Sequence, residues 1–452
     1  MEKTKDERNK TVWRIVGSLI AVAVFFGAIL ILNSCGGGGG GSEGPKVDNS
    51  DQNQNNPPAD DNKNPPPDNN TNPPPDIKTA GLIQLPKTGQ TVSYAKGDDG
   101  DIQAGASWPS SRFIDNGNNT VTDNLTGLMW MKKPITSKVT TLGAAIYVDK
   151  INRGFISTGT SYIDWRIPNV YELRSVSDFS KIDVMLPASY FPDINNGLYW
   201  TSTTMNIITL AANIQTGLVE RLDSNYYYTI DLEKADLWLV RGLSTGLTAV
   251  PKTGQKICYG PDEGSTHQIN CGKRIGWIVQ EKSSCYYKWK NGSSEHAIEI
   301  PCDGARQDGQ YQAGIAWPNP RLIDNGDNTV TDKLTGLMWV KNSRLKADAT
   351  WQQALDYTDQ MNKDKKFGYS DWRLPNINEL FSVIDCSGTS CAIYPPFQYP
   401  QGSGSNHWSS TTYAGDVTRA WYWTSWLFEV GMHHGSKSAT RDVWPVRTMP
   451  AK

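Results

Sequence analysis

The spacing of apolar side chains predicts an amphipathic helix in the C-terminal half of the chain. Side chains that one helical face would bury recur at relative positions 0, 3, 4, 7 and 10, and they are Trp351, Ala354, Leu355, Thr358 and Met361. Thr350 stands directly before them and is suited to cap the helix N-terminus. A weaker form of the pattern predicts a matching helix in the first half, through Leu142, Ala145, Ile146 and Ile151.

Sequence patterns typical of strands also occur twice, once in each half of the chain. Residues 114–130 return as residues 323–339, with 15 of 17 positions identical. In each segment, Asn-Gly would supply the positive φ angles of a tight hairpin turn, Thr-Val-Thr begins the returning strand, and Leu-Met-Trp forms its buried end. The two segments begin 209 residues apart, and a repeat unit of that length is long enough to be a domain. We therefore expect two copies, residues 81–245 and 246–452, each with its own core and each unfolding separately.

A second helix is predicted in each copy by a capping box. Asn169 is followed three residues later by Glu172, and Asn376 by Glu379, so a helix should begin directly after each Asn. The arginine three residues before each Asn is expected to pair with that glutamate, or with the aspartate two residues before the arginine. This arrangement explains the acidic and basic residues without a catalytic role.

The first 34 residues have the pattern of an export signal. Basic residues precede an uncharged apolar run, residues 15–32. The sequence Leu-Asn-Ser-Cys that ends at Cys35 resembles the lipobox of bacterial lipoproteins, in which the cysteine is diacylated and becomes the new N-terminus. We expect a membrane partner through this lipid, and Gly36 favours delivery to the outer membrane of the cell envelope. An uncleaved transmembrane anchor is the alternative, because the run could just span a bilayer.

Residues 35–80 are rich in Gly, Pro, Asn and Asp and contain almost no apolar side chains. Such a segment cannot offset its ordering entropy by burial, so we expect a disordered tether. The formal net charge of the chain is −2, and neither copy has a strong excess of basic residues. Nucleic acid is therefore not an expected partner, and the sequence specifies no oligomeric state.

Six cysteines follow Cys35, all of them in the second copy. An even set in an exported chain indicates disulfides. Cys386 and Cys391 flank a short Ser/Gly/Thr loop and are expected to pair. Three connectivities are open for the other four: Cys258, Cys271, Cys285 and Cys302.

Together these motifs resemble the Lcl C-terminal domain family, once a domain of unknown function and named after a collagen-like bacterial surface adhesin. The shared order is GxxTVTDxLTGLMW, DWRLPNxxEL, WSSTT and a terminal WxVR. The resemblance implies an α+β, C-type-lectin-like fold: two tandem domains, each with two helices and antiparallel strands. It also implies distant kinship to formylglycine-generating enzymes and, from the named member, binding of sulfated glycans. The first copy departs after Thr204, where it lacks the Ala-Trp-Tyr segment of the second.

The leading hypothesis is a surface lipoprotein that acts as a binding module or adhesin for glycans or matrix components. It is not expected to be an enzyme, because no catalytic constellation is present. Two alternatives stay open. One is an oxidase of the formylglycine-generating type, for which Cys386 and Cys391 are the candidate pair, and the other is a purely structural envelope protein.

Binding is expected in the second copy, on residues 421–441. Aromatic faces suit sugar rings and cations suit sulfate or carboxylate, and the candidates are Trp421, Trp423, Trp426, His433, His434, Lys437 and Arg441. Trp421 and Trp423 share one strand face, which is core in the alternative interpretation. Trp426 and Phe428 share the other face. We expect one aromatic pair at the surface, because a half-exposed sheet buries one face.

No metal or other cofactor is expected, although two metal sites were considered. Asp324, Asp327 and Asp332 are calcium candidates, but their loop lacks the spacing and the glutamate of an EF-type site. His407 with His433 and His434 is the other set. Adjacent histidines on a strand point to opposite faces, which argues against a shared ion.

The lipobox gives a direct prediction. Labelling of cells with palmitate should mark this protein, and Cys35→Ala should abolish the label, because the acyl chains are attached to that thiol. A label that persists in the variant, or release of unlipidated protein at an unchanged mass, would favour the uncleaved anchor.

Overall fold

The computed structural model describes most of the chain beyond the predicted tether. The described residues are 83–139, 141–182, 186–194, 197–205, 208–213, 219–221, 235–256, 258–261, 274–275, 278–279, 297–300, 306–385, 393, 395–398, 406–426 and 429–450. Residues 75–452 belong to one compact unit. The predicted export signal, Cys35 and the tether lie outside the described residues.

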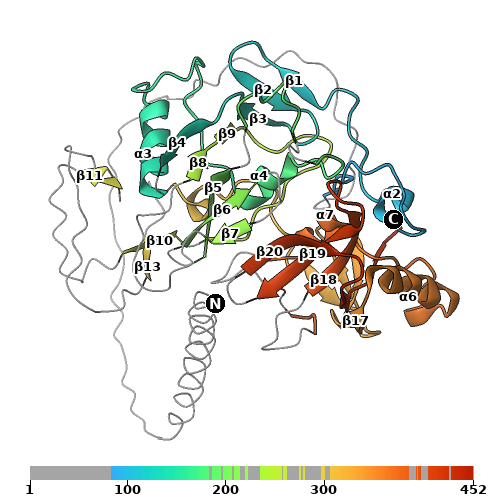
Figure 1. The fold of residues 1–452 in the computed structure, drawn as a ribbon. Coiled ribbons are helices and arrows are strands. Elements are labelled where there is room, and N and C mark those ends of the chain that lie inside the picture. Colours follow the sequence, from blue (N-terminus) through green and yellow to red (C-terminus); the bar gives the residue numbers. More distant parts are fainter. Residues whose placement is uncertain are drawn as a thin grey trace, which may run out of the picture. The chain divides into compact units, whose positions relative to one another are not determined.

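Within its described residues, the first copy contains two sheets and two helices of more than one turn, and Figure 1 shows them. A four-stranded sheet has the order β1 (Phe113–Asp115), β2 (Thr120–Asp123), β3 (Leu128–Met131), β9 (Val240–Arg241). A five-stranded sheet has the order β4 (Ile135–Val139), β8 (Ala235–Leu237), β5 (Leu198–Met205), β6 (Ile208–Asn213), β7 (Val219–Arg221). The helices are α3 (Thr141–Asn152) and α4 (Val170–Ser175), after a one-turn helix α2 (Asp99–Ile102).

The second copy repeats this plan strand for strand. Its four-stranded sheet is β14 (Leu322–Asp324), β15 (Thr329–Asp332), β16 (Leu337–Val340), β22 (Val446–Thr448). Its five-stranded sheet is β17 (Lys346–Ala349), β21 (Arg441–Val443), β18 (Asn406–Thr412), β19 (Arg419–Trp426), β20 (Glu429–Ser436). The helices are α5 (Asp308–Tyr311), α6 (Trp351–Lys363), the 3-10 turn η1 (Lys366–Gly368) and α7 (Ile377–Ser382). Two short strand pairs precede the hairpin of this copy and have no counterpart among the described residues of the first. They are β10 (Cys258–Pro261) with β13 (Ala297–Ile300), and β11 (Arg274–Ile275) with β12 (Ile278–Val279).

The class is therefore mixed helix and strand, with small and mainly antiparallel sheets. One pairing in each copy is parallel, because the last strand of the five-stranded sheet returns beside the strand that begins its hairpin. These pairs are β5 with β8, through Tyr199 and Asp236, and β18 with β21, through His407 and Asp442.

The hairpin turn differs in detail from the expected one. Its positive φ angles are on Gly117 (74°) and Asn119 (63°), so the Asn of Asn-Gly does not carry one. Asn116 has another task, since its Nδ2 donates hydrogen bonds to the hydroxyls of Thr120 (2.9 Å) and Thr122 (3.0 Å). The repeated Thr-Val-Thr thus holds the turn through its hydroxyls as well as forming the strand.

The predicted helix starts are confirmed. Asn169 Oδ1 accepts from the Glu172 amide at 2.8 Å, and the Glu172 carboxylate accepts from the Asn169 amide at 3.0 Å. Asn376 and Glu379 make the same capping box, and Thr350 caps α6. The buried side of α6 consists of the five residues whose spacing predicted it.

The predicted charge pairs are also present, with the partners now fixed. Arg166 forms a bidentate pair with Glu172 at 2.5 and 2.6 Å, whereas Asp164 pairs with Arg241 of the closing strand at 2.6 Å. The second copy repeats both, as Arg373 with Glu379 and Arg447 with Asp371. Each copy is therefore closed on itself by the arginine of its terminal WxVR motif.

The two copies share one hydrophobic core, contrary to the expectation of separate cores. Tyr171 of α4 meets Phe381 of α7 at 5.3 Å between ring centroids, and its hydroxyl donates to the Ile384 carbonyl. Phe179 meets Trp421 edge-on at 5.4 Å. We therefore expect joint unfolding, because neither copy can open without exposing aromatic surface of the other.

Among the described helices, none has the length and apolarity needed to cross a membrane. The apolar run of residues 15–32 lies outside the described residues.

Substitution of the buried glutamate tests both the pairing and the shared core. Glu379→Gln should lower the free energy of unfolding by about 3 kcal/mol, because Arg373 would keep a buried charge without its carboxylate. Hydrogen exchange should show the loss of protection in α4 of the first copy as well as in α7. Lys363→Ala breaks an exposed pair with Asp359 and should leave the unfolding midpoint unchanged. Destabilisation confined to the second copy would contradict a shared core.

Candidate functional site

The predicted binding segment forms the outer hairpin of the second five-stranded sheet. Strands β19 and β20 pair in antiparallel register, with Trp421 opposite His434, Tyr422 opposite His433 and Trp423 opposite Met432. Strand β20 is the edge strand of this sheet. Figure 1 shows α6 beside the strands β17 and β18 of the same copy.

Trp421 and Trp423 belong to the core, which corrects their predicted role in binding. Each is only 1% exposed. Trp421 packs on Phe179 of the first copy, and Trp423 lies 6.4 Å from the Phe381 ring. The other face of the sheet is partly covered too, by the α6 cluster that includes Trp351 and Trp408. Trp421 and Trp423 are therefore not the surface pair. The expectation that the other pair, Trp426 and Phe428, lies at the surface stays a prediction. The Trp426 side chain lies outside the described residues.

The cationic candidates lie where β19 begins and β20 ends, on both faces of the sheet: Arg419 and His434 on the face of Trp421, and His433 and Arg441 on the face of Tyr422. We call this group the cationic end; it consists of Arg419, His433, His434, Lys437 and Arg441, with the rings of Tyr94, Tyr413 and Tyr422. Among the described residues, no carboxylate lies within ion-pair distance of its Arg and Lys side chains. Lys437 and Arg441 lie against aromatic rings instead, and Arg419 contacts the His434 imidazole.

Arg441 is stacked between two rings. Its guanidinium carbon lies 3.7 Å from the centroid of Tyr422 and 4.1 Å from that of Trp408. Gly435 makes room for it, since a Cβ there would lie 2.3 Å from Arg441 Nη2. Burial lowers the pKa of Arg441 from its ordinary value, although hydrogen bonding and charge interaction with Tyr422 oppose this. An arginine stays charged under these conditions.

Lys437 is placed in the same manner. Its Nζ lies 3.8 Å from the Trp351 ring and 5.2 Å from the Tyr94 ring, and it donates a hydrogen bond to Thr412 Oγ1 at 2.8 Å. Burial lowers the pKa of Lys437 to about 8. The ammonium is therefore charged at neutral pH and loses its charge as the pH rises through about 8.

The two adjacent histidines lie on opposite faces of the strand, as expected. His434 stacks on Tyr413 with 3.8 Å between centroids, whereas His433 stacks on Tyr422. Arg419 Nη1 lies 3.2 Å from His434 Nδ1, and a guanidinium can only donate, so Nδ1 must accept and the imidazole is neutral. Burial, followed by the Arg419 charge, lowers the pKa of His434 accordingly.

The two metal sets are used in other ways. His407 is fully buried beside Trp444, and burial lowers its pKa to about 4. The calcium candidates are engaged separately: Asp324 with Lys341, Asp327 with Thr329 and Asp332 with Arg321. The part of the chain that the structure describes contains no cluster of three or more His, Cys, Asp or Glu suited to a metal ion.

Of the six cysteines expected to form disulfides, Cys258 is the one among the described residues. Cys258 is buried and disulfide-bonded. Every other cysteine, including the expected pair Cys386 and Cys391, lies outside the described residues. The pairing scheme, and the oxidase alternative that depends on Cys386 and Cys391, therefore stay predictions.

Comparison with known families gives a match at two places. The model of the Lcl C-terminal domain matches residues 119–241 and 328–447, which together are more than half of the chain. The chain belongs to the Lcl C-terminal domain family. It contains two tandem copies of the domain. No curated protein and no solved structure gives a significant match.

The signature residues of both Lcl domains are structural. Arginine and glutamate of the DWRxPNxxEL motif form the buried pair, its asparagine caps a helix, and its aspartate holds the arginine of WxVR. In the WSSTT motif, Thr411 Oγ1 accepts a hydrogen bond from the Ile377 amide. The motif residues named here therefore stabilise the fold.

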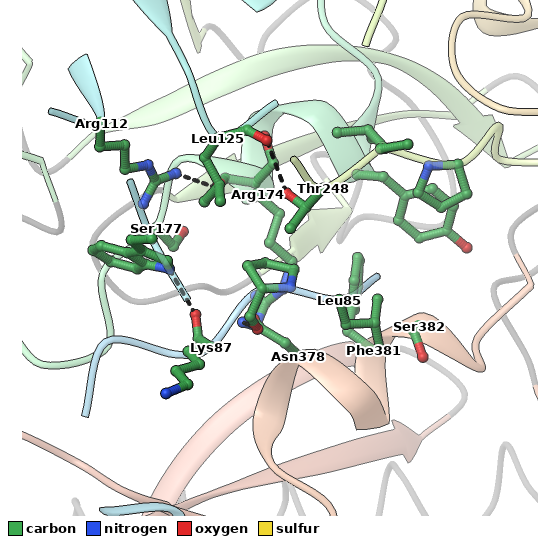
Figure 2. Close-up of a pocket in the computed structure, with 17 residues that line it drawn as sticks. Leu85, Lys87, Arg112, Leu125, Arg174, Ser177, Thr248, Asn378, Phe381 and Ser382 are labelled. Atoms are coloured by element: carbon green, nitrogen blue, oxygen red, sulfur yellow. Dashed lines mark hydrogen bonds between the residues drawn. The ribbon is translucent and has the colours of Figure 1, made fainter. Parts of the chain in front are cut away.

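A pocket of about 70 Å³ lies where the two Lcl domains meet (Figure 2). Arg112 and Arg174 of the first domain and Asn378 and Phe381 of the second line it. Arg174 lies 5.0 Å from the Phe179 ring and 4.6 Å from the Phe381 ring, and burial lowers its pKa to about 9. The described lining contains no carboxylate, thiol or imidazole. Its polar groups include the hydroxyls of Ser177 and Ser382 and the Lys87 side chain.

Two buried aspartates were missed in the sequence. Asp99 accepts hydrogen bonds from Thr88 (2.6 Å) and from Thr411 of the second domain (2.7 Å), and Asp308 accepts one from Thr253. Burial raises the pKa of Asp99 to about 6 and that of Asp308 to about 7. Nothing local in the sequence marks them, because their burial comes from the other copy.

Asp308 should make stability depend on pH. Its folded-state pKa is above the unfolded value, so its contribution is complete below about pH 4 and is lost as the pH rises through about 7. Compared with Asp308→Asn, which does not titrate, the parent should lose more than about 1 kcal/mol of unfolding free energy between pH 5 and 8. The charges that face Asp308 are Glu172, Arg166 and Lys252, and they are the same in both proteins.

The measurement is the urea midpoint at several pH values. Asp416→Asn is the matched control, because hydrogen bonds from Thr418 lower the pKa of Asp416 and its difference from the parent should stay constant over this range. Parallel curves for the parent and Asp308→Asn would contradict the prediction.

Proposed function

We propose that this protein is a lipid-anchored binding module of the bacterial cell envelope, and that the cationic end of its second domain holds acidic glycans. The Lcl family, the predicted lipobox at Cys35 and the predicted tether support a surface role. Delivery to the outer membrane and a C-type-lectin-like arrangement of each domain are parts of the same proposal.

The observation that carries the proposal is the contrast between two sets of cations. Buried arginines of the fold, such as Arg166, Arg321 and Arg373, each have a carboxylate partner. Arg419, Lys437 and Arg441 have no carboxylate within ion-pair distance among the described residues, although Asp416 and Asp98 act on Arg419 and Lys437 from farther away. Lys437 and Arg441 lie against aromatic rings, and Arg419 contacts the His434 imidazole. A sulfate or carboxylate of a sugar would supply the missing negative charge, while rings of the same group offer faces to the sugar.

The strands of the first domain differ at the positions compared. Strand β6, the counterpart of β19, contains no aromatic or charged residue, and Ala235 of β8 takes the place of Arg441. We therefore assign binding to the second domain, with the first domain and the shared core as its support.

Affinity measurements with the full chain test the proposal. Binding to an immobilised heparin-like glycan should fall about tenfold in Lys437→Ala and in Arg441→Ala, as expected for the loss of one charge-assisted contact. Binding to a neutral glycan should be weaker in every variant. Lys341→Ala is the matched control, because Lys341 belongs to the same domain and pairs with Asp324 away from the cationic end.

The dependence of binding on salt concentration and on pH tests the proposal further. Binding should weaken with salt, because exposed charges are screened. It should also weaken from pH 7 to 9 in the parent but less in Lys437→Ala, because the Lys437 ammonium loses its proton as the pH rises through about 8. Equal affinity of the parent, both site variants and the control would remove the cationic end from consideration.

A further inference from the structure

The segment that precedes each domain is an arm that packs on the other domain. The first arm is residues 83–106, and the second is residues 248–256 with 306–315. Each contains Pro-Lys-Thr-Gly-Gln and ends in a one-turn helix. A parallel bridge closes each arm on itself, Pro86 with Ala106 and Pro251 with Ile315. Helix α2 of the first arm contacts β18 of the second domain, and α5 of the second arm contacts β5 of the first.

A glutamine joins each arm to the opposite domain. Gln90 Oε1 accepts from the Thr412 amide at 3.1 Å while its Nε2 donates to the Thr412 carbonyl. Gln255 makes the same two bonds to Thr204, with 3.1 Å for the amide bond. Both glutamines are buried. A side-chain amide therefore pairs with one residue of a strand as a neighbouring strand would.

The helix-capping asparagines make a second contact. Asn376 Nδ2 donates to the Ala104 carbonyl at 3.1 Å, and Asn169 Nδ2 donates to the Ala313 carbonyl at 3.2 Å. In the second domain, Asn378 Nδ2 also donates to the Pro86 carbonyl at 3.1 Å. The same asparagine side chain thus caps its own helix and holds the arm of the other domain.

The arms keep one shape. Gly105 and Gly314 have φ angles of 113° and 109°, and a Cβ at either position would lie within 2.8 Å of backbone atoms where the arm turns back. The family match begins only at residues 119 and 328, after both arms. Each Lcl domain is therefore completed by a segment that lies outside its own match and comes from the other copy.

We propose that each domain carries a recognition site for such an arm, and that a second molecule of this chain can supply it, so that two molecules join by exchanging arms. The glutamine contact and the asparagine contact are common to both domains, and neither requires that the arm and the domain belong to one molecule. Within one molecule, the tethered arm has a high effective concentration, of the order of millimolar. Exchange should therefore become important where molecules are concentrated.

A peptide of residues 83–106 carrying a fluorophore is the probe, and anisotropy with the full chain is the measurement. The parent chain should bind it weakly, because its own arm occupies the site. The Gln90→Ala chain should bind it at least tenfold more tightly, since the competing arm has lost two buried hydrogen bonds. A peptide that itself carries Gln90→Ala should bind that chain about tenfold more weakly than the parent peptide. Asn378→Ala, added to the Gln90→Ala chain, should weaken binding and so place the peptide on the second domain.

Hydrogen exchange at Ile83, whose amide donates to the Leu334 carbonyl of the second domain, reports whether Gln90→Ala releases the arm. If the arm stays protected, the glutamine is not what holds it, and the proposal is wrong. If the arm is released and the peptide still does not bind, or both peptides bind alike, the proposal is equally overturned. Mixed oligomers of two differently tagged chains, formed faster by Gln90→Ala than by the parent at high concentration, are the result expected for exchange between molecules. No mixed oligomer at any concentration would overturn the proposal that two molecules exchange arms.

Discussion

The buried pair between Arg373 and Glu379 is the interaction on which the rest of the second domain depends. The Arg373 backbone exchanges two hydrogen bonds of 2.9 Å with Val446, which fixes the closing strand. Glu379 accepts from the Asn376 amide, which starts α7, and the Asn376 side chain holds the arm of the first domain. Two opposite charges in a dry interior are costly unless every donor and acceptor is satisfied. That requirement sets strand, helix and arm in one geometry, and the first domain repeats it with Arg166 and Glu172.

Local rules in the sequence were sufficient for the elements that this pair organises. The capping boxes after Asn169 and Asn376, and the buried face of α6, depend on residues three or four positions apart, and both are as predicted. The duplication and the family motifs also placed the strands in the right order. Features that depend on residues close together in the sequence could therefore be predicted from it.

Contacts between distant residues were not readable. Trp421 and Trp423 share a strand face, but β19 carries aromatic residues on both faces, so alternation could not identify the core. The decision comes from Phe179, which lies in the other copy. The packing of each arm on the other domain could not be predicted for the same reason, since Gln90 and Thr412 are 322 residues apart. The sequence showed two equal motifs, Pro-Lys-Thr-Gly-Gln, but not that each one serves the other copy.

This arrangement also explains where a ligand site can be placed without loss of stability. Cations inside the shared core have to be paired, and a change to one of them leaves a buried charge uncompensated. Arg419, Lys437 and Arg441 lie where the edge strand ends, half-buried against rings that shield their stems and leave their charge only partly hydrated. Core residues and the first arm contact them directly, since Trp408 packs on Arg441 and Tyr94 of the arm lies over Lys437. A duplicated fold whose signature residues are all engaged in the scaffold can therefore acquire binding in one copy at a sheet edge, and the other copy need not follow.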